Sequence, residues 1–257
     1  MTKNQFEAFC EFRLEFKSYC KNLNEAFSEK LAPLVKSAAN ADTPEYPLET
    51  AVVYNKALDE ITADSQINLI IIGDNPGKDE QLAKNNKYLV GQSGKIAAGF
   101  FSRNPELRTD FRKNAIILNK TPVHTAKTKH LKFLEKNGGE EIKNLIFDSQ
   151  EFMAKKTAAL HKELLSGAED GFPELWLVGY AELKSRGIFL HYRDTLKKAY
   201  DGAELGGAWE KVLVFQHFSM NRFSIDLNDF RAASDGTDLA SAIHLLGKSH
   251  REEIFGA

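Results

Sequence analysis

The sequence predicts an α/β fold: a three-layer α/β/α sandwich with a central four-stranded parallel sheet and additional N-terminal helices. Four short apolar runs carry this prediction, at residues 68–73, 115–119, 175–179 and 212–216. Each run is apolar almost throughout, which is typical of strands that are buried on both faces. Stretches with helical character separate the runs, and parallel strands joined by helical crossovers are the economical arrangement.

The N-terminal part of the chain is predicted to be helical. Apolar residues stand at helical spacing in residues 5–38, beginning with Phe6, Phe9 and Phe12. Because proline interrupts helices, we expect Pro33 at or near a junction in this segment. A small, polar linker follows at residues 39–47, and a short helix is predicted over residues 52–61.

Between the predicted strands, helices are expected at residues 95–101, 149–165 and 181–199. We interpret residues 1–257 as one domain. In this interpretation residues 1–62 form a helical extension that packs on a core of residues 67–222.

Composition limits the possible function classes. The 257 residues are 42% hydrophobic and 27% charged, with a formal net charge of -2, so binding to nucleic acid would require a local basic face. The two cysteines, Cys10 and Cys20, are too few for a disulfide scaffold or a four-cysteine metal site. No stretch approaches the roughly 20 apolar residues of a membrane span. The N-terminus lacks the apolar core of a secretory signal, so we expect a cytoplasmic protein.

Polar motifs follow each of the four apolar runs. They are Gly73-Asp74-Asn75-Pro76-Gly77, Asn119-Lys120-Thr121-Pro122, Gly179-Tyr180 and Gln216-His217-Phe218-Ser219. In a parallel sheet these motifs converge on one edge, where such folds bind their ligands. The sequence therefore predicts a functional site at this edge.

These motifs together resemble the uracil-DNA glycosylase superfamily. Residues 73–77 are similar to the first active-site motif of that family, and residues 87–95 to its glycine-containing segment that enters a helix. Residues 116–119 resemble the strand that ends in the base-binding Asn, and residues 177–181 the third strand with its Gly. His217-Phe218-Ser219 resembles the last motif, with Phe218 in place of a proline. The resemblance runs in order from residue 68 to residue 222.

The resemblance implies a DNA glycosylase that hydrolyses the N-glycosidic bond of uracil or a related damaged base, with water as the nucleophile. It places Asp74 and Asn75 at the positions that handle the water, and His217 opposite the departing base. An acid stands at the Asp74 position in the iron–sulfur branch, and an amide at the Asn75 position in the mismatch-type and single-strand-selective branches. The alternative for Asp74 and Asn75 is a turn shaped by their side chains, and for His217 a structural role.

The resemblance also implies a base-binding set and a phosphate-binding set. Gly73, Tyr88 and Asn119 would bind the base, with Tyr88 stacking on it; the alternative for Tyr88 is core packing. The residues implied to contact DNA phosphates or grooves are Gly91, Ser93, Gly94, Ser219 and Arg222.

A group of basic residues after the first two strands is a further candidate for DNA contact, although charge runs are more commonly solvated surface. The group comprises Arg103, Arg108, Arg112, Lys113, Lys120, Lys127, Lys129 and Lys132, with His124 and His130 among them.

We expect a monomer that acts on single- or double-stranded DNA without a cofactor or a metal. The iron–sulfur branches require four ligating cysteines, which this chain lacks. No Lys in the matched motifs is placed for a Schiff base, so a monofunctional enzyme is expected.

Two other functions stay open. The chain is then either a nucleic-acid-binding homologue without catalysis or an α/β enzyme that acts on free nucleosides or nucleotides. Gly77-Lys78 suggests a phosphate loop, but the full Gly-x-x-x-x-Gly-Lys-Ser/Thr pattern is absent.

Overall fold

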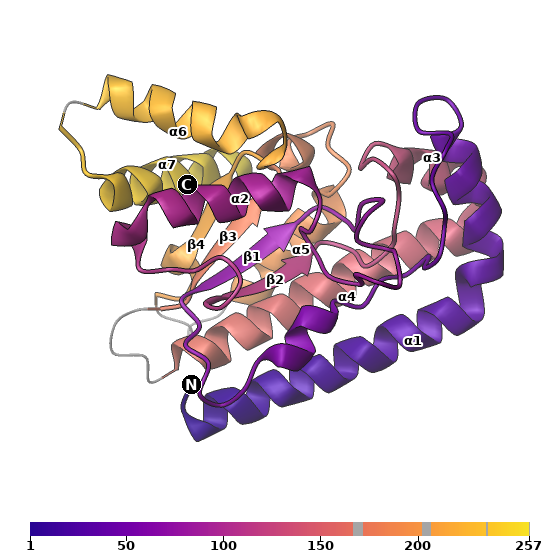
Figure 1. Cartoon of the computed structure of the whole chain (residues 1–257), viewed down its shortest axis with the longest axis horizontal. Helices are drawn as coiled ribbons and strands as arrows, with labels where there is room; N and C mark the ends of the chain where they lie inside the picture. The colour runs from indigo at the N-terminus through magenta and orange to yellow at the C-terminus, as the bar shows by residue number, and fades with distance from the viewer. Residues whose placement is uncertain (167–171, 202–206, 235, 257) are drawn as a thin grey trace.

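A computed structural model describes residues 1–166, 172–201, 207–234 and 236–256. Its centre is a parallel sheet with the strand order β2-β1-β3-β4 (Figure 1). The strands are β1 (Leu69–Gly73), β2 (Ala115–Asn119), β3 (Glu174–Val178) and β4 (Val212–Phe215). The predicted α/β class and four-stranded parallel sheet are therefore confirmed, with each strand within one residue of its expected bounds.

The strand order determines where a ligand can bind. Chain order reverses between β1 and β3, because β1 pairs with β2 on one side and with β3 on the other. In open parallel sheets this reversal creates a crevice outside the carboxyl ends of the strands. Gly73 and Asn119 are paired in register at this edge, so the residues after β1, β2 and β3 meet there.

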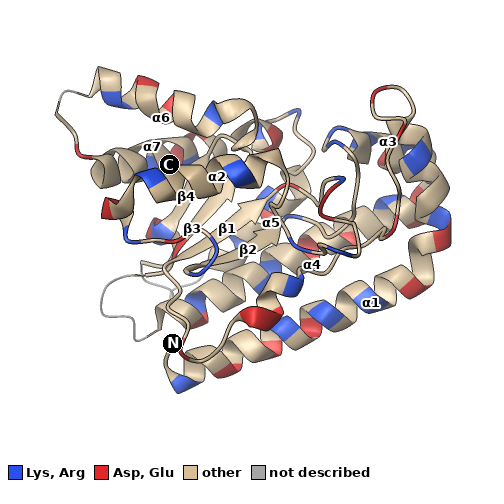
Figure 2. Ribbon diagram, in the orientation of Figure 1, with Lys and Arg blue, Asp and Glu red and all other residues tan. Residues whose placement is uncertain are grey.

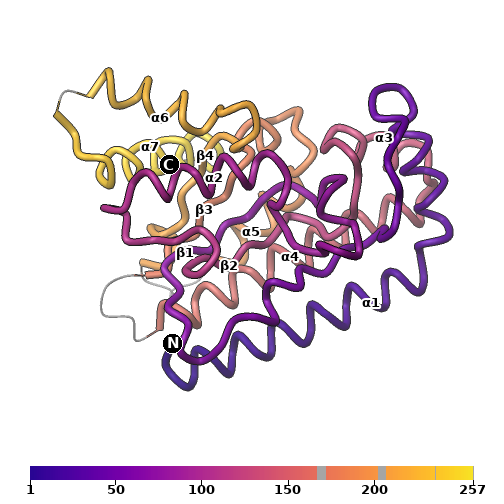
Figure 3. Tube along the Cα trace, in the orientation of Figure 1, coloured from indigo at the N-terminus to yellow at the C-terminus, as the bar shows by residue number. Residues whose placement is uncertain are grey.

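Helices cover both faces of the sheet, an arrangement compatible with a three-layer sandwich (Figure 1). One face carries α2 (Gln92–Arg103), α6 (Arg222–Ala233) and α7 (Leu239–Phe255), and the other carries α4 (Gly139–Leu165) and α5 (Leu190–Tyr200). The trace in Figure 3 shows α1 (Lys3–Ala39) running beside α4, and the short α3 (His130–Asn137) contacts both. Helix α7 approaches β4 closely, since a Cβ on Gly247 would lie 2.6 Å from the ring of Phe215.

The N-terminal segment differs from its prediction in two ways. Helix α1 is continuous and contains Pro33 in its interior. An internal proline costs about 3 kcal/mol, but Leu31 and Val35 beside it are buried, and their packing offsets that cost. The helix predicted over residues 52–61 is wrong: only a 3₁₀ turn at Lys56–Glu60 is present. The β-branched Val52 instead forms an antiparallel bridge with Val123.

The predicted helix over residues 181–199 is also partly wrong. A 3₁₀ turn at Tyr180–Leu183 follows β3, and α5 begins only at Leu190. The amide of Phe189 donates to the carbonyl of Glu182 at 3.0 Å, which closes a loop between the two elements. Helices α3, α6 and α7 were not predicted, and α2 and α4 begin earlier than expected.

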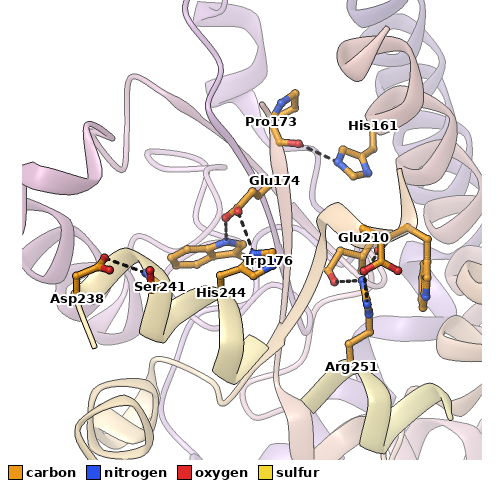
Figure 4. A network of polar contacts seen from close by, with 11 residues as sticks. His161, Pro173, Glu174, Trp176, Glu210, Asp238, Ser241, His244 and Arg251 are labelled. Atoms are coloured by element: carbon orange, nitrogen blue, oxygen red, sulfur yellow. Dashed lines mark hydrogen bonds and ion pairs between the residues drawn. The ribbon is translucent and has the colours of Figure 1, made fainter. Parts of the chain in front are cut away.

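At the opposite, amino edge of the sheet, polar contacts join strands to helices (Figure 4). The indole of Trp176 donates to Glu174 at 2.9 Å, and Arg251 of α7 donates to the carbonyl of Trp209 at 2.6 Å and to Glu210 at 2.9 Å. The Arg251 bonds hold α7 against the residues that precede β4, and the Trp176 bond lies within β3. The polar groups named here thus have partners within the fold.

Among the described residues, no helix is both long enough and apolar enough to cross a membrane.

Candidate functional site

A cleft of about 760 Å³ opens at the carboxyl edge of the sheet. It is lined by residues that end or follow the four strands, including Asp74, Asn119, Gly179 and His217. The structure therefore brings together the strand-end motifs that the sequence analysis expected to meet. The predicted site residues on its wall are Asp74, Asn75, Gly91, Ser93, Asn119, Ser219, Arg222 and His217.

The carboxylate of Asp74 forms a buried ion pair with Lys120. The Nζ atom of Lys120 lies 2.6 Å from Oδ1 of Asp74, and the Lys120 side chain has no exposed surface. Its ammonium group also donates to the backbone carbonyls of Gly73 and Val178, at the ends of β1 and β3. Oδ2 of Asp74 makes no hydrogen bond with the described residues, so this oxygen is available to a ligand or water in the cleft.

Two glycines give the cleft's side chains the space that they occupy. A Cβ on Gly179 would overlap Oδ1 of Asp74 and lie 3.1 Å from its Cγ. A Cβ on Gly73 would overlap Oδ1 of Asn119. The role of Gly73 is thus to admit Asn119, and a direct contact with a base is not needed to explain a glycine there.

The imidazole of His217 has a defined tautomer. Its Nδ1 atom accepts a hydrogen bond from the backbone amide of Ser219 at 3.1 Å and lies 2.8 Å from the Ser219 hydroxyl. An amide can only donate, so Nδ1 carries a lone pair and the proton is on Nε2. Desolvation lowers the pKa of His217, the Asp74 charge opposes this shift, and the Lys120 charge adds to it. The ring is therefore neutral at pH 7, with the Nε2 hydrogen as its available donor.

Asn119 presents a buried amide without a partner. Its side chain is only 2% exposed and lines the cleft, and its Nδ2 atom has no hydrogen-bond partner among the described residues. A buried polar atom left without a partner costs about 1–3 kcal/mol. Such a group is expected where a ligand completes the hydrogen bond.

Asn75 is fixed by its own loop. Its Nδ2 atom donates to the carbonyl of Val123 at 3.1 Å and to the hydroxyl of Thr125 at 2.8 Å. These bonds join the loop after β1 to the loop after β2. The amide donors of Asn75 are thus engaged, and only its carbonyl oxygen is left to orient a molecule in the cleft.

Glu80 joins two further loops of the cleft. One of its oxygens accepts from the amide of Gly77 at 3.2 Å and the other from the amide of Leu89 at 2.9 Å. Burial raises the pKa of Glu80 to about 7, against the lowering effect of these two hydrogen bonds. The side chain therefore holds the loops at residues 77 and 89 in a fixed relation.

Three predicted site residues do not line the cleft: Gly73, described above, Tyr88 and Gly94. Tyr88 is 1% exposed, and its hydroxyl donates to the carbonyl of Val53 at 2.5 Å. The hypothesis that Tyr88 stacks on a base is therefore wrong, and the alternative of core packing describes it. Gly94 is also buried. A Cβ there would overlap the carbonyl of Leu89, so the glycine allows the loop at Leu89 to pack against α2.

The phosphate-contact candidates lie on the cleft wall in two groups. Gly91 and Ser93 are at the N-terminus of α2, where backbone amides face outward, while Ser219 and Arg222 flank the loop after β4. In that loop Met220 has a left-handed backbone with φ 52° and a side chain 75% exposed.

Phe218 anchors this loop. Its side chain is fully buried, and its ring lies 5.0 Å from that of Phe223 and 6.5 Å from that of Phe111. Aromatic packing thus fixes the base of the loop while its tip is exposed.

The predicted basic surface is not continuous. Lys120 and His124 are buried, and His124 contacts the carbonyl of Pro76 at 2.8 Å. Lys127 and Lys129 pair with Asp42 at 3.1 and 2.6 Å, as does the largely buried His130 at 3.0 Å. Arg112 donates to the carbonyls of Tyr88 and Leu89. Arg103 is the last residue of α2, and Arg108 and Lys113 lie between α2 and β2, toward the amino edge.

Elsewhere on the molecule, acidic and basic residues are interspersed, as along α1, where Lys3 pairs with Glu7 and Lys21 with Glu25 (Figure 2).

Met220 has no predicted site role, and Lys120 belongs to the group of basic residues that was predicted to be surface. For Lys120 the available signal was its position directly after the apolar run of residues 115–119; the structure shows that residues 115–125 are buried throughout. For Met220 no sequence signal distinguishes it from a core methionine.

The fold and the cleft define a class of protein, namely an α/β protein with a polar cleft at the carboxyl edge of a parallel sheet. Comparisons with protein-family models, curated proteins and solved structures found no match for this chain. Within the described residues, no three His, Cys, Asp or Glu side chains are grouped so that they could hold a metal ion.

Proposed function

We propose that this protein is a DNA glycosylase, which hydrolyses the N-glycosidic bond of uracil or a related deaminated base and acts on DNA as a monomer. One observation carries the proposal. The cleft combines a carboxylate oxygen without a protein partner (Asp74), a neutral imidazole donor (His217) and an unpartnered buried amide (Asn119).

Each of these groups matches one requirement of the reaction. Oδ2 of Asp74 accepts a hydrogen bond from the attacking water and stabilises positive charge on the sugar as the bond to the base lengthens. The carbonyl oxygen of Asn75 assists in orienting that water. Water adds to C1′ of the sugar as the bond from C1′ to the base nitrogen breaks. The bonding electrons leave with the base, and the proton that the water loses passes to Oδ2 of Asp74.

The departing base carries the negative charge, and Nε2–H of His217 donates to it. A neutral donor suffices for this stabilisation and is typically worth about 3–4 kcal/mol in the transition state. The Nδ2 donor of Asn119 pairs with a carbonyl on the edge of the base, which completes its missing hydrogen bond.

DNA would approach through the rim of the cleft. Ser93, Ser219 and Arg222 offer donors for phosphate oxygens, and Met220 extends from the rim as an apolar side chain. Apolar wedges of this kind, including Met, insert between base steps and favour the flipped state of a base. This gives the insertion role to Met220, with Arg222 contacting phosphate.

The lysine in the site favours the water route over a Schiff base. All three acceptors of the Lys120 ammonium group are protein atoms, and the side chain does not line the cleft. A Schiff base would require a neutral amine in contact with C1′. We therefore propose a monofunctional enzyme that leaves an abasic site.

The test uses single- and double-stranded oligonucleotides that carry uracil, hypoxanthine or xanthine, followed by alkaline cleavage of abasic sites. We expect strand breaks with the unmodified protein and a loss of about 100-fold or more in Asp74→Ala and His217→Ala. Asp64→Ala and His191→Ala, which change the same residue types away from the cleft, serve as matched controls.

Two outcomes would contradict the proposal in different ways. Salt-sensitive oligonucleotide binding without cleavage of any substrate indicates a binding protein without catalysis. Release of free base from deoxyuridine or its phosphate, without release from oligonucleotides, indicates an enzyme of free nucleosides or nucleotides.

A further inference from the structure

Lys120 is the one lysine with a fully buried side chain in the part of the chain that the structure describes. It lies beneath the point where the chain order of the sheet reverses, because its ammonium group bonds to Gly73 at the end of β1 and to Val178 at the end of β3. The ring of Phe189 lies 5.0 Å from its Nζ atom. Burying a charged lysine is costly, and the ion pair with Asp74 offsets part of that cost.

We propose that Lys120 is a positioning residue of the cleft, which holds the Asp74 carboxylate with Oδ2 toward the ligand and balances its charge beside His217. The proposal rests on the proposed function for its effect on catalysis, but its effect on His217 is independent of any reaction. No contact between Lys120 and substrate is needed.

The orientation of Asp74 follows from two contacts on the same oxygen. Oδ1 receives the Lys120 hydrogen bond at 2.6 Å and lies against Gly179. A carboxylate held at one oxygen and packed at the same side cannot rotate freely, so Oδ2 keeps one direction. Without the lysine, the buried carboxylate would lose its only protein hydrogen bond among the described residues.

The charge balance involves one ionisable group after each strand: Asp74, Lys120, Glu182 and His217. The charges of Asp74 and Glu182 raise the pKa of Lys120, against the larger lowering effect of burial. For His217, the Asp74 charge raises the pKa and the Lys120 charge lowers it. The other charged residues on the cleft wall are Lys78, Asp79, Glu80, Lys127 and Arg222.

Neutrality of His217 matters for the loop after β4. Protonated Nδ1 would carry a hydrogen and could no longer accept the amide of Ser219, which now donates to it at 3.1 Å. The positive charge of Lys120 thus favours the state in which the His217–Ser219 hydrogen bond is intact. The charge of Lys120, beneath the carboxyl edge of the sheet, thus influences the geometry of the loop after β4.

A charge cycle tests the proposal without relying on activity. The His217 Cε1–H resonance, assigned by its loss in His217→Gln, is titrated by NMR in the unmodified protein, Asp74→Asn, Lys120→Met and the Asp74→Asn/Lys120→Met double variant. We expect the pH at the midpoint of the His217 titration to fall in Asp74→Asn and to rise in Lys120→Met. Each shift should correspond to a change of about threefold or more in the protonation constant of His217.

Removal of one partner of a buried pair is strongly destabilising, so the double variant replaces Lys120→Met in the comparison if that single variant does not fold. It is set against Asp74→Asn, where the amide oxygen at position 74 still accepts from Lys120. In the double variant positions 74 and 120 both carry uncharged side chains, so no unpaired charge is buried there. The midpoint of the His217 titration in the double variant should lie above that in Asp74→Asn, again by about threefold or more in the protonation constant. Equal midpoints in these two variants would overturn the charge-balancing role.

Single-turnover base release tests the orientation role. We expect Lys120→Met to lower the rate of the chemical step by about 10-fold or more with little change in oligonucleotide affinity, and Lys120→Arg to restore part of it. Unchanged rates in a folded Lys120→Met would refute this role. If the unmodified protein releases no base, the proposed function fails, whereas the His217 titration still decides the inference about Lys120.

Discussion

Gly179 lies so close to Asp74 that no side chain can be added there without moving the carboxylate. A Cβ at Gly179 would overlap Oδ1 and lie 3.1 and 3.2 Å from Cγ and Oδ2. The backbone of Gly179 is also left-handed, with φ 97°. The glycine after β3 therefore determines the position of the acid after β1.

Gly179→Ala should reduce base release by about 100-fold, because a shift of about 1 Å in a catalytic group has an effect of this size. Gly139→Ala is the matched control, since Gly139 also has a positive φ of 73° but a Cβ there meets nothing within 4 Å. Both variants carry the backbone strain, of about 1–3 kcal/mol, which thermal unfolding measures. Equal loss of activity in the two would show that strain alone is responsible.

Asn119→Ala and Asn55→Ala should separate ligand binding from folding. Asn55 is buried and fully bonded, donating to Ile117 at 2.8 Å and accepting from the amides of Ala57 and Tyr88. Its removal leaves buried partners unpaired and should cost about 2–4 kcal/mol of unfolding free energy. Asn119 has an unpartnered Nδ2, so its removal should change stability by less than about 1 kcal/mol.

Binding of the base should be affected in the opposite order, with the larger loss in Asn119→Ala than in Asn55→Ala. Urea unfolding and the affinity for free uracil are measured for both variants at one pH. Asn119→Ala should bind the base at least about 10-fold more weakly, the value of one hydrogen bond. A strongly destabilised Asn119→Ala would mean that its amide supports the fold instead.

Met220→Gly should leave stability unchanged or slightly increased, because glycine accepts the left-handed conformation at φ 52° without strain. We expect base release from duplex DNA to fall by about 10-fold more than release from single strands, since unstacking is needed only in the duplex. Leu245→Ala, a partly exposed apolar residue on α7, is the control. An equal effect on both substrates would argue against a wedge.

The buried His161 should make stability depend on pH. Its ring contacts the hydroxyl of Tyr200 at 2.6 Å and the carbonyl of Pro173 at 3.0 Å, and burial lowers its pKa from 6.5 to about 4. The unfolded chain therefore binds more protons between these pH values. The stabilisation is present above pH 6.5 and is lost as the pH falls toward 4.

His161→Gln isolates this contribution. The drop in unfolding free energy between pH 7 and pH 5 should be smaller by about 2 kcal/mol than in the unmodified protein. Glu80, with a pKa raised to about 7, acts in the opposite direction in both proteins and cancels in the comparison. His191→Gln, at a partly exposed site, is the control; the same pH dependence in all three proteins would contradict the prediction.

The sequence alone determined the parallel sheet and the edge at which the cleft lies. Buried strands such as Ile70 to Ile72 and Ile116 to Leu118 are continuous apolar runs, and few other structures accommodate such runs between helices. The polar residues directly after them, Asp74 and Asn119, must then lie at the carboxyl edge. These positions depend on local pattern and chain direction, which a sequence contains.

Tertiary structure decided which side chains face the cleft. Tyr88 looked like a base-stacking residue but is buried against Val53, a segment 35 positions away. Lys120 looked like a surface charge but lies under Asp74, 46 positions away. Neither partner is local, and the polar character of a residue does not show whether its charge is solvated or paired. Only the packing of loops from different strands places the lysine beneath the acid.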